Sequence, residues 1–164
     1  MNIYPYKPPK IADETTSLSR GSPDSSLREK DKLFGAIPQT VMVNPAAFIA
    51  CSKKGVPGVW VKHIINATGQ KALFAALLDV SEEGLFQVYR RPYLTTHESE
   101  RVLDAARVLL KAIRVWESNT LAFEWLNSQV PALGMAQPFI LFDTFEGRRW
   151  VSQVLEHIEY GDFS

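Results

Sequence analysis

Residues 71–90 read KALFAALLDVSEEGLFQVYR, and this stretch predicts two short helices joined by a turn. A small residue, Ala75, stands where two helices have to approach closely, and Asp79 occupies the turn position at which glycine is common. Apolar residues recur where a helix-turn-helix needs them to pack its helices together. They are Phe74, Leu78, Val80, Leu85 and Val88. The middle of the chain therefore predicts a helix-turn-helix.

The second of these helices is expected to begin at Ser81. A serine there can cap the helix, and Glu82 and Glu83 in the first turn complement its dipole. The same two acids weaken a DNA-binding interpretation, because the N-terminal end of a recognition helix approaches phosphates. Arginines at a helix end are equally explained by the dipole, so direct DNA binding stays open. The candidate DNA contacts are Lys71, Ser81, Gln87, Tyr89, Arg90 and Arg91.

Upstream of this motif the sequence is less uniform. Apolar residues at helical spacing predict a helix over Val59–Ala67, which Gly69 can end. Residues 33–56 leave two interpretations open, because Gln39–Val43 suits a short strand and Pro45–Cys51 suits a helix with proline at its first position.

The first 32 residues are rich in Pro, Ser and Thr. Such a segment buries too little apolar surface to offset the entropy lost on ordering, so it is predicted to be a flexible tail. The sequence then divides into this tail, a helix-turn-helix domain with an N-terminal extension over residues 33–96, and a second helical domain over residues 97–164. The expected fold class is all-α.

Thr95 and Glu98 form a capping box that predicts a long helix, running to about Ser118. Its apolar stripe is wider than that of a lone surface helix, which indicates burial on two sides. A central core helix and a core helix that also forms a homodimer interface are equally compatible with this pattern. The stripe consists of Val102, Leu103, Ala106, Leu109, Leu110, Ile113 and Trp116.

Two more helices are expected after the long one. The first is short and contains Trp125. Asp143 with Glu146 forms another capping box that starts the last helix, and Gly161 can end it. The apolar stripe of the last helix consists of Trp150, Val151, Val154, Leu155 and Ile158.

Composition excludes several classes of protein. Lys plus Arg and Asp plus Glu number 18 each in the 164 residues, so any nucleic-acid binding has to come from a local patch or a dimer. A single cysteine excludes an intramolecular disulfide framework and suits a reducing compartment. With no long apolar run, a soluble, cytoplasmic protein without membrane contact is expected.

The residues that carry catalysis elsewhere are scattered in this chain. His63, His97 and His157 lie far apart and offer no metal-ligand spacing, and no glycine-rich phosphate loop is present. Cys51 is expected to be a small packed residue rather than a nucleophile. We therefore expect no catalytic residues, no metal and no cofactor, and a binding protein rather than an enzyme.

A series of short motifs in the C-terminal half gives a more specific indication. The order and spacing of these motifs resemble the C-terminal domain of the Xre/MbcA/ParS antitoxin family, and the resemblance covers roughly residues 95–164. Met135 departs from the family pattern, and the N-terminal tail is not part of its shared core. The motifs are Glu98-Ser99-Glu100-Arg101, Ala122-Phe123-Glu124-Trp125-Leu126, Leu133-Gly134, Gln137-Pro138, Asp143-Thr144 with Gly147, Val151 and Leu155, and Ile158-Glu159-Tyr160-Gly161.

The resemblance implies an antitoxin that binds and blocks a toxin, typically a RES-domain enzyme that consumes NAD or a related ADP-ribosylating enzyme, and that can repress its own operon. The last residues would reach toward the toxin's NAD pocket. Arg148 and Arg149, expected on the exposed first turn of the last helix, would add contacts. The candidate toxin-binding residues are Trp125, Arg148, Arg149, Glu159, Tyr160, Gly161, Asp162, Phe163 and Ser164.

A helix-turn-helix transcriptional regulator without a toxin partner is the alternative interpretation. A neighbouring gene for a RES-type enzyme favours the antitoxin, and its absence favours the regulator.

Overall fold

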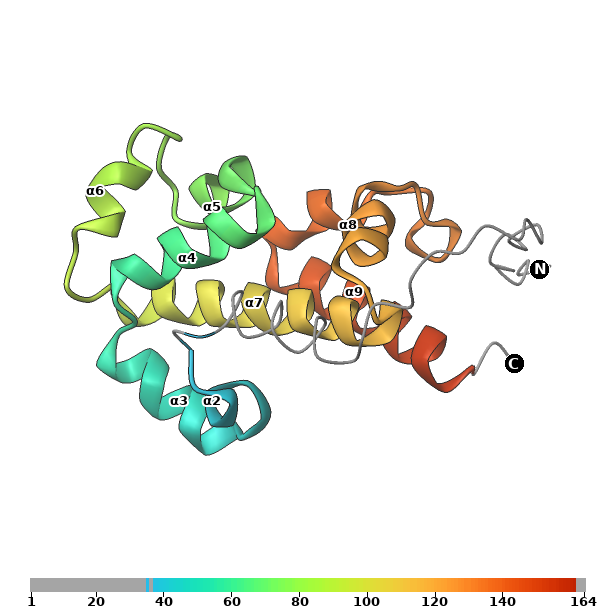
Figure 1. The fold of residues 1–164 in the computed structure, drawn as a ribbon, viewed down its shortest axis with the longest axis horizontal. Coiled ribbons are helices and arrows are strands. Elements are labelled where there is room, and N and C mark those ends of the chain that lie inside the picture. Colours follow the sequence, from blue (N-terminus) through green and yellow to red (C-terminus); the bar gives the residue numbers. More distant parts are fainter. Residues whose placement is uncertain (1–34, 36, 162–164) are drawn as a thin grey trace, which may run out of the picture.

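The structure is a computed structural model in which Gly35 and residues 37–161 are described. These residues form helices and no strand, apart from one isolated bridge between Val130 and Ala136 (Figure 1). The all-α fold class predicted from the sequence is confirmed. The tail predicted over residues 1–32 lies outside the described residues.

Two helices occupy the region before residue 56 that the sequence leaves undecided. α2 spans Gln39–Val43 and α3 spans Pro45–Lys54, so the strand interpretation of the first segment is wrong and the helix interpretation of the second is confirmed. Asn44 caps α3, because its side-chain oxygen accepts from the backbone N–H groups of Ala46 at 2.9 Å and Ala47 at 3.1 Å. α2 and α3 pack against each other.

α4 spans Gly58–Thr68 and ends at Gly69 as predicted. It packs against α6, which spans Leu85–Tyr89. A Cβ atom on Gly58 would lie 1.9 Å from the backbone oxygen of Val88, so only glycine allows this approach.

The two helices predicted for residues 71–90 are present, but the second is shorter than expected. α5 spans Lys71–Leu77, and α6 begins at Leu85 rather than at Ser81. Ser81 caps a single turn before α6 instead, where its hydroxyl accepts from the N–H of Gly84 at 3.1 Å. Asp79 adopts a left-handed conformation with φ 54°, at the position where glycine is common in such turns. Seven residues therefore separate two short helices.

α7, spanning Thr96–Trp116, is the central helix of the fold (Figure 1). It begins with the predicted capping box of Thr95 and Glu98. None of its residues from 101 to 113 is fully exposed, because α3, α5, α8 and α9 all pack against it. The wide apolar stripe is therefore accounted for by neighbours within one chain.

The C-terminal part packs on the second half of α7. α8 spans Asn119–Asn127, two 3-10 helices follow as η1 (Pro131–Leu133) and η2 (Pro138–Asp143), and α9 spans Phe145–Tyr160. α5 lies against η2, so the two halves of the chain share one hydrophobic core. In the part of the chain that is described, no helix is both long and apolar enough to cross a membrane.

Candidate functional site

α9 divides its side chains between a buried and an exposed face. Val151, Val154 and Leu155 are buried against α7 and the 3-10 helices. Because successive residues turn by about 100° around a helix, Gln153, His157 and Tyr160 fall away from this face and Trp150 falls at its edge. These four are exposed. α9 is thus fixed by one face and offers the other to a partner.

The start of α9 lies close to η2. A Cβ atom on Gly147 would lie 1.9 Å from the backbone oxygen of Leu141, so the contact requires glycine. Thr144 caps the helix, with its hydroxyl accepting from the N–H of Gly147 at 3.0 Å. The capping residue is therefore Thr144 rather than the predicted Asp143. This packing fixes the direction in which α9 runs.

Arg148 does not lie on an exposed turn, and that expectation is wrong. Only 4% of its surface is accessible. Its Nε donates to Asp104 of α7 at 2.6 Å and its Nη1 donates to the backbone oxygen of Phe142 at 2.6 Å. The side chain faces inward because the buried arc of α9 includes position 148. Arg148 therefore joins α7, η2 and α9 and is not a free surface group.

Trp125 is also a core residue, 6% exposed. Its ring lies 6.2 Å from that of Trp116, centre to centre, across the junction of α7 and α8. A tryptophan on the inner face of a short amphipathic helix is buried for the same reason as its apolar neighbours. Trp125 supports the candidate surface from beneath rather than forming it.

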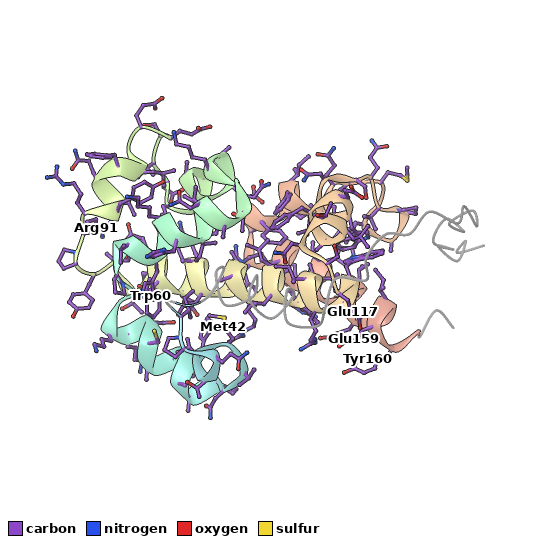
Figure 2. The ribbon with its side chains drawn as sticks, viewed as in Figure 1. Met42, Trp60, Arg91, Glu117, Glu159 and Tyr160 are labelled. Atoms are coloured by element: carbon purple, nitrogen blue, oxygen red, sulfur yellow. The ribbon has the colours of Figure 1, made fainter. Side chains whose placement is uncertain are left out.

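The remaining candidate toxin contacts lie along the exposed side and the end of α9. Arg149 is exposed and pairs with Glu146 at 3.2 Å. Glu159 pairs with Arg114 of α7 at 3.0 Å, while Tyr160 beside it is 77% exposed (Figure 2). Gly161 ends the helix in a left-handed conformation. The candidates Asp162, Phe163 and Ser164 lie outside the described residues.

Exposed apolar side chains that were not among the sequence-predicted contacts surround these residues. Phe145 is 66% exposed and Trp150 is 42% exposed, and we call these two with Tyr160 the apolar face. The predicted buried stripe includes Trp150, because it stands four residues before Val154. In the structure it lies at the edge of that stripe, since the buried arc is centred near Val151. Plotting the residues of α9 around the helix axis would have separated Trp150 from the buried residues.

Further apolar residues of the C-terminal part are exposed on α8, after η1 and on η2. Leu121, Met135 and Ile140 are 48%, 54% and 65% exposed, respectively. Large apolar side chains are common at the buried centre of protein interfaces, and a contiguous exposed group of them marks an interaction site. These side chains are available, together with the apolar face, for contact with a partner.

The candidate DNA contacts are brought to one end of the molecule, but their charges are partly neutralised. Lys71 lies 3.5 Å from Glu82, and Arg91 forms two hydrogen bonds of 2.8 Å with Glu98. Ser81 and Gln87 are exposed, and Tyr89 is half-buried, which raises the pKa of its hydroxyl. Arg90 is exposed and lies over the ring of Phe86 at 5.6 Å.

The pairing of Arg91 with Glu98 has a clear electrostatic effect. Hydrogen bonds from Arg91, and then from the backbone and side chain of Thr95, lower the pKa of Glu98 from 4.5 to about 2. Glu98 therefore stays ionised and fixes Arg91 to the start of α7. Although Arg91 is a candidate DNA contact, its first role is to join the end of α6 to α7.

The described residues offer little for catalysis. No three His, Cys, Asp or Glu side chains among them gather into a group that can hold a metal ion. Cys51 is partly buried, and burial raises the pKa of its thiol, which disfavours the reactive thiolate.

Two comparisons with known proteins agree with this geometry. The profile of a family described as the antitoxin Xre/MbcA/ParS C-terminal toxin-binding domain matches residues 111–161, which include the end of α7 and all of α8 and α9. The chain is also 34% identical over 133 residues to the "Prs ADP-ribosylating antitoxin" of Sphingobium sp. (strain YBL2), an alignment that covers 74% of this chain and 83% of that protein. An all-helical fold that presents an exposed face within the matched domain fits both findings. The chain therefore belongs to the Xre/MbcA/ParS family of antitoxins.

Proposed function

We propose that this antitoxin neutralises an enzyme that consumes NAD or transfers ADP-ribose, of the RES type, by binding it directly and covering its active site. The observation that carries the proposal is the exposure of Phe145, Trp150 and Tyr160 on a helix inside the matched toxin-binding domain. The name of the Sphingobium relative associates that protein with ADP-ribosylation, which supports the enzyme class.

The geometry of α9 supports occlusion as the mechanism. Its inner face is held by the core and by the pairing of Arg148 with Asp104, so the helix is fixed before the toxin arrives. A fixed surface loses little conformational entropy on binding, which favours a tight complex. The apolar face buries against the enzyme, and the chain beyond Gly161 extends toward the nucleotide site.

A truncated antitoxin tests this mechanism. The chain ending at Glu159 removes Tyr160 and the residues after it while keeping α9 almost whole. Co-purification with a tagged toxin should persist or weaken modestly, and NAD consumption or ADP-ribosyl transfer by the toxin should return. Full inhibition by the truncated chain would place the blocking surface elsewhere.

We also propose that the protein represses its own operon from the cytoplasm as a homodimer, through α5 and α6. Gln87 and Arg90 are exposed there and are the side chains best placed to contact DNA. Operator shift assays with and without toxin test the regulatory role, and absence of binding in both conditions would contradict it.

A further inference from the structure

The positive charges of the described residues fall into two groups. Seven arginines and lysines each pair with an acidic side chain, and Arg107 is stacked on the ring of Phe48 at 4.1 Å. Four others are exposed and have no acidic partner in the described part of the chain. The paired set is Lys71, Arg91, Arg101, Lys111, Arg114, Arg148 and Arg149. The unpaired set, which we call the basic end, is Lys53, Lys54, Lys62 and Arg90.

The sequence explains why these charges remain unpaired. Between Lys32 and Asp79 the chain contains no aspartate or glutamate, although the whole protein carries 18 acids and 18 bases. α2, α3, α4 and α5 therefore contribute only positive charge. The helix dipole accounts for Lys53 and Lys54 in the last turn of α3, but not for Lys62 in the middle of α4.

Two backbone hydrogen bonds bring the elements of the basic end together. The N–H of Gly58 donates to the oxygen of Arg91 at 3.0 Å, and the N–H of Leu94 donates to the oxygen of Val56 at 2.8 Å. The segment that follows Lys54 is thus joined to the segment that follows Arg90. Figure 2 shows Trp60 and Arg91, which flank this junction, at the end of the molecule opposite Glu159 and Tyr160.

Lys62 lies on the outward side of α4. It is one turn from Val59, and both are exposed, whereas Val61 and Ile64 between and beside them are buried. Because Val59 follows Gly58 at the junction, Lys62 extends the same surface along α4. The basic end is therefore one surface made from α3, α4 and the end of α6.

From this arrangement we propose that the basic end binds the phosphate backbone of a DNA duplex. Flexible lysines without acidic partners suit phosphates, which need a nearby positive charge rather than a fixed geometry. Of the acids that precede α6, Asp79 is paired with Arg101 and Glu82 with Lys71, whereas Glu83 has no cationic partner in the described part of the chain and repels phosphate from that end of the helix. The duplex would approach the C-terminal end of α6, beside Arg90.

The inference deepens the DNA-binding half of the proposed function and does not depend on the toxin-binding half. It replaces Lys71 and Arg91, whose charges are neutralised, with three lysines that are not among the sequence-predicted contacts. It concerns phosphate contacts, which set affinity and salt dependence, and leaves base recognition to α6.

The test compares the full-length protein with the triple variant K53Q/K54Q/K62Q. Binding to a duplex from upstream of its own gene is measured by fluorescence anisotropy over a series of salt concentrations. The slope of log K against log salt is negative, and its magnitude falls by about 0.9 for each lost phosphate contact. The triple variant should therefore show a slope about 2 to 3 smaller in magnitude than that of the wild type. These lysines are exposed, so circular dichroism melts should stay unchanged.

A matched control replaces cations that already have partners, in the double variant K71Q/R149Q, and its slope should change by less than about 1. Equal salt slopes for the wild type and the triple variant would overturn the inference. A control variant that loses as much slope as the triple variant would also overturn it, and so would a wild-type protein that does not bind the duplex. Toxin inhibition is assayed in parallel. Unchanged inhibition by the triple variant is expected, whereas its loss with an unaltered DNA slope would identify the basic end as a protein-binding surface and overturn the inference.

Discussion

The two ends of α7 carry different surfaces. The basic end, beside the start of α7, consists of solvated cations without acidic partners among the described residues. Near the other end of α7, Lys111 and Arg114 hold Glu156 and Glu159 of α9, and exposed aromatic rings such as that of Tyr160 lie beside these ion pairs. Charge that is paired inside the protein cannot attract a ligand, whereas unpaired charge and exposed aromatic rings can bind one. The difference indicates that one end suits a polyanion and the other a protein.

The strongest test of this contrast concerns how the C-terminal end is held. Arg148→Ala should lower the free energy of unfolding by about 3–5 kcal/mol, because it leaves Asp104 and the Phe142 carbonyl without their donor. Urea denaturation followed by circular dichroism measures the change. Arg149→Ala, at the exposed neighbouring position, should stay within about 0.5 kcal/mol of wild type. Similar stability for both variants would show that Arg148 does not hold α9.

The next test breaks the apolar face without unfolding the protein. Trp150→Ala should weaken the toxin complex by about 2 kcal/mol, roughly 30-fold in Kd, because tryptophans dominate interface energies. Calorimetry with purified toxin measures it. Phe86→Ala removes a side chain that is 62% exposed at the other end of the molecule and should leave the affinity unchanged. Equal losses in the two variants would contradict the assignment of the apolar face.

A pH titration sharpens the contrast at the start of α7. The pKa of Glu98 lies near 2 in the folded protein and at 4.5 without its partners, so its stabilisation is complete above pH 4.5 and is lost as the pH falls toward 2. Glu98→Gln should remove this acid limb and cost on the order of 1 kcal/mol at neutral pH, given solvent screening. Thermal melts from acid to neutral pH measure both effects. If the stability of Glu98→Gln fell at low pH as much as that of the wild type, Glu98 would not be the group responsible.

The smallest expected effect is that of the surface pair at the end of α9. A double-mutant cycle on Arg114 and Glu159 should give a coupling energy of about 0.2–1 kcal/mol that decreases with salt, because the pair is solvent-accessible. Chemical denaturation at low and high salt measures it. A coupling well above this range, or one insensitive to salt, would mean that the pair is more buried than its exposure indicates.

Much of the fold can be predicted from local signals. The capping box at Thr95 and Glu98, the glycine after α4 and the glycine after α9 mark helix ends correctly, because caps act within a few residues. α6 begins later than predicted, since Ser81 caps one turn that does not continue into the helix. The short motifs of the C-terminal part are enough to indicate the antitoxin family, and both comparisons agree with them.

Local sequence signals predict the residues of the candidate site less well. Arg148 and Arg149 are neighbours with the same side chain, yet one is 4% exposed and the other lies on the surface. Their difference depends on Asp104, which lies 44 residues away along the chain and beside Arg148 only after α7 and α9 have packed. Trp150 was predicted to be buried and is exposed, whereas Trp125 was predicted to contact the toxin and is buried. Both differences depend on how the helices pack.

The sequence by itself determined most of the helices from α4 onward, many of their ends and the family, because these depend on spacing and on residues near one another in the chain. Only the tertiary structure decided which charges are neutralised, since ion pairs join residues from separate helices. It therefore also decided which cations and aromatic rings remain for partners. Lys71 and Lys62 are alike in the sequence, but packing places Glu82 beside the first and leaves the second without an acidic neighbour among the described residues.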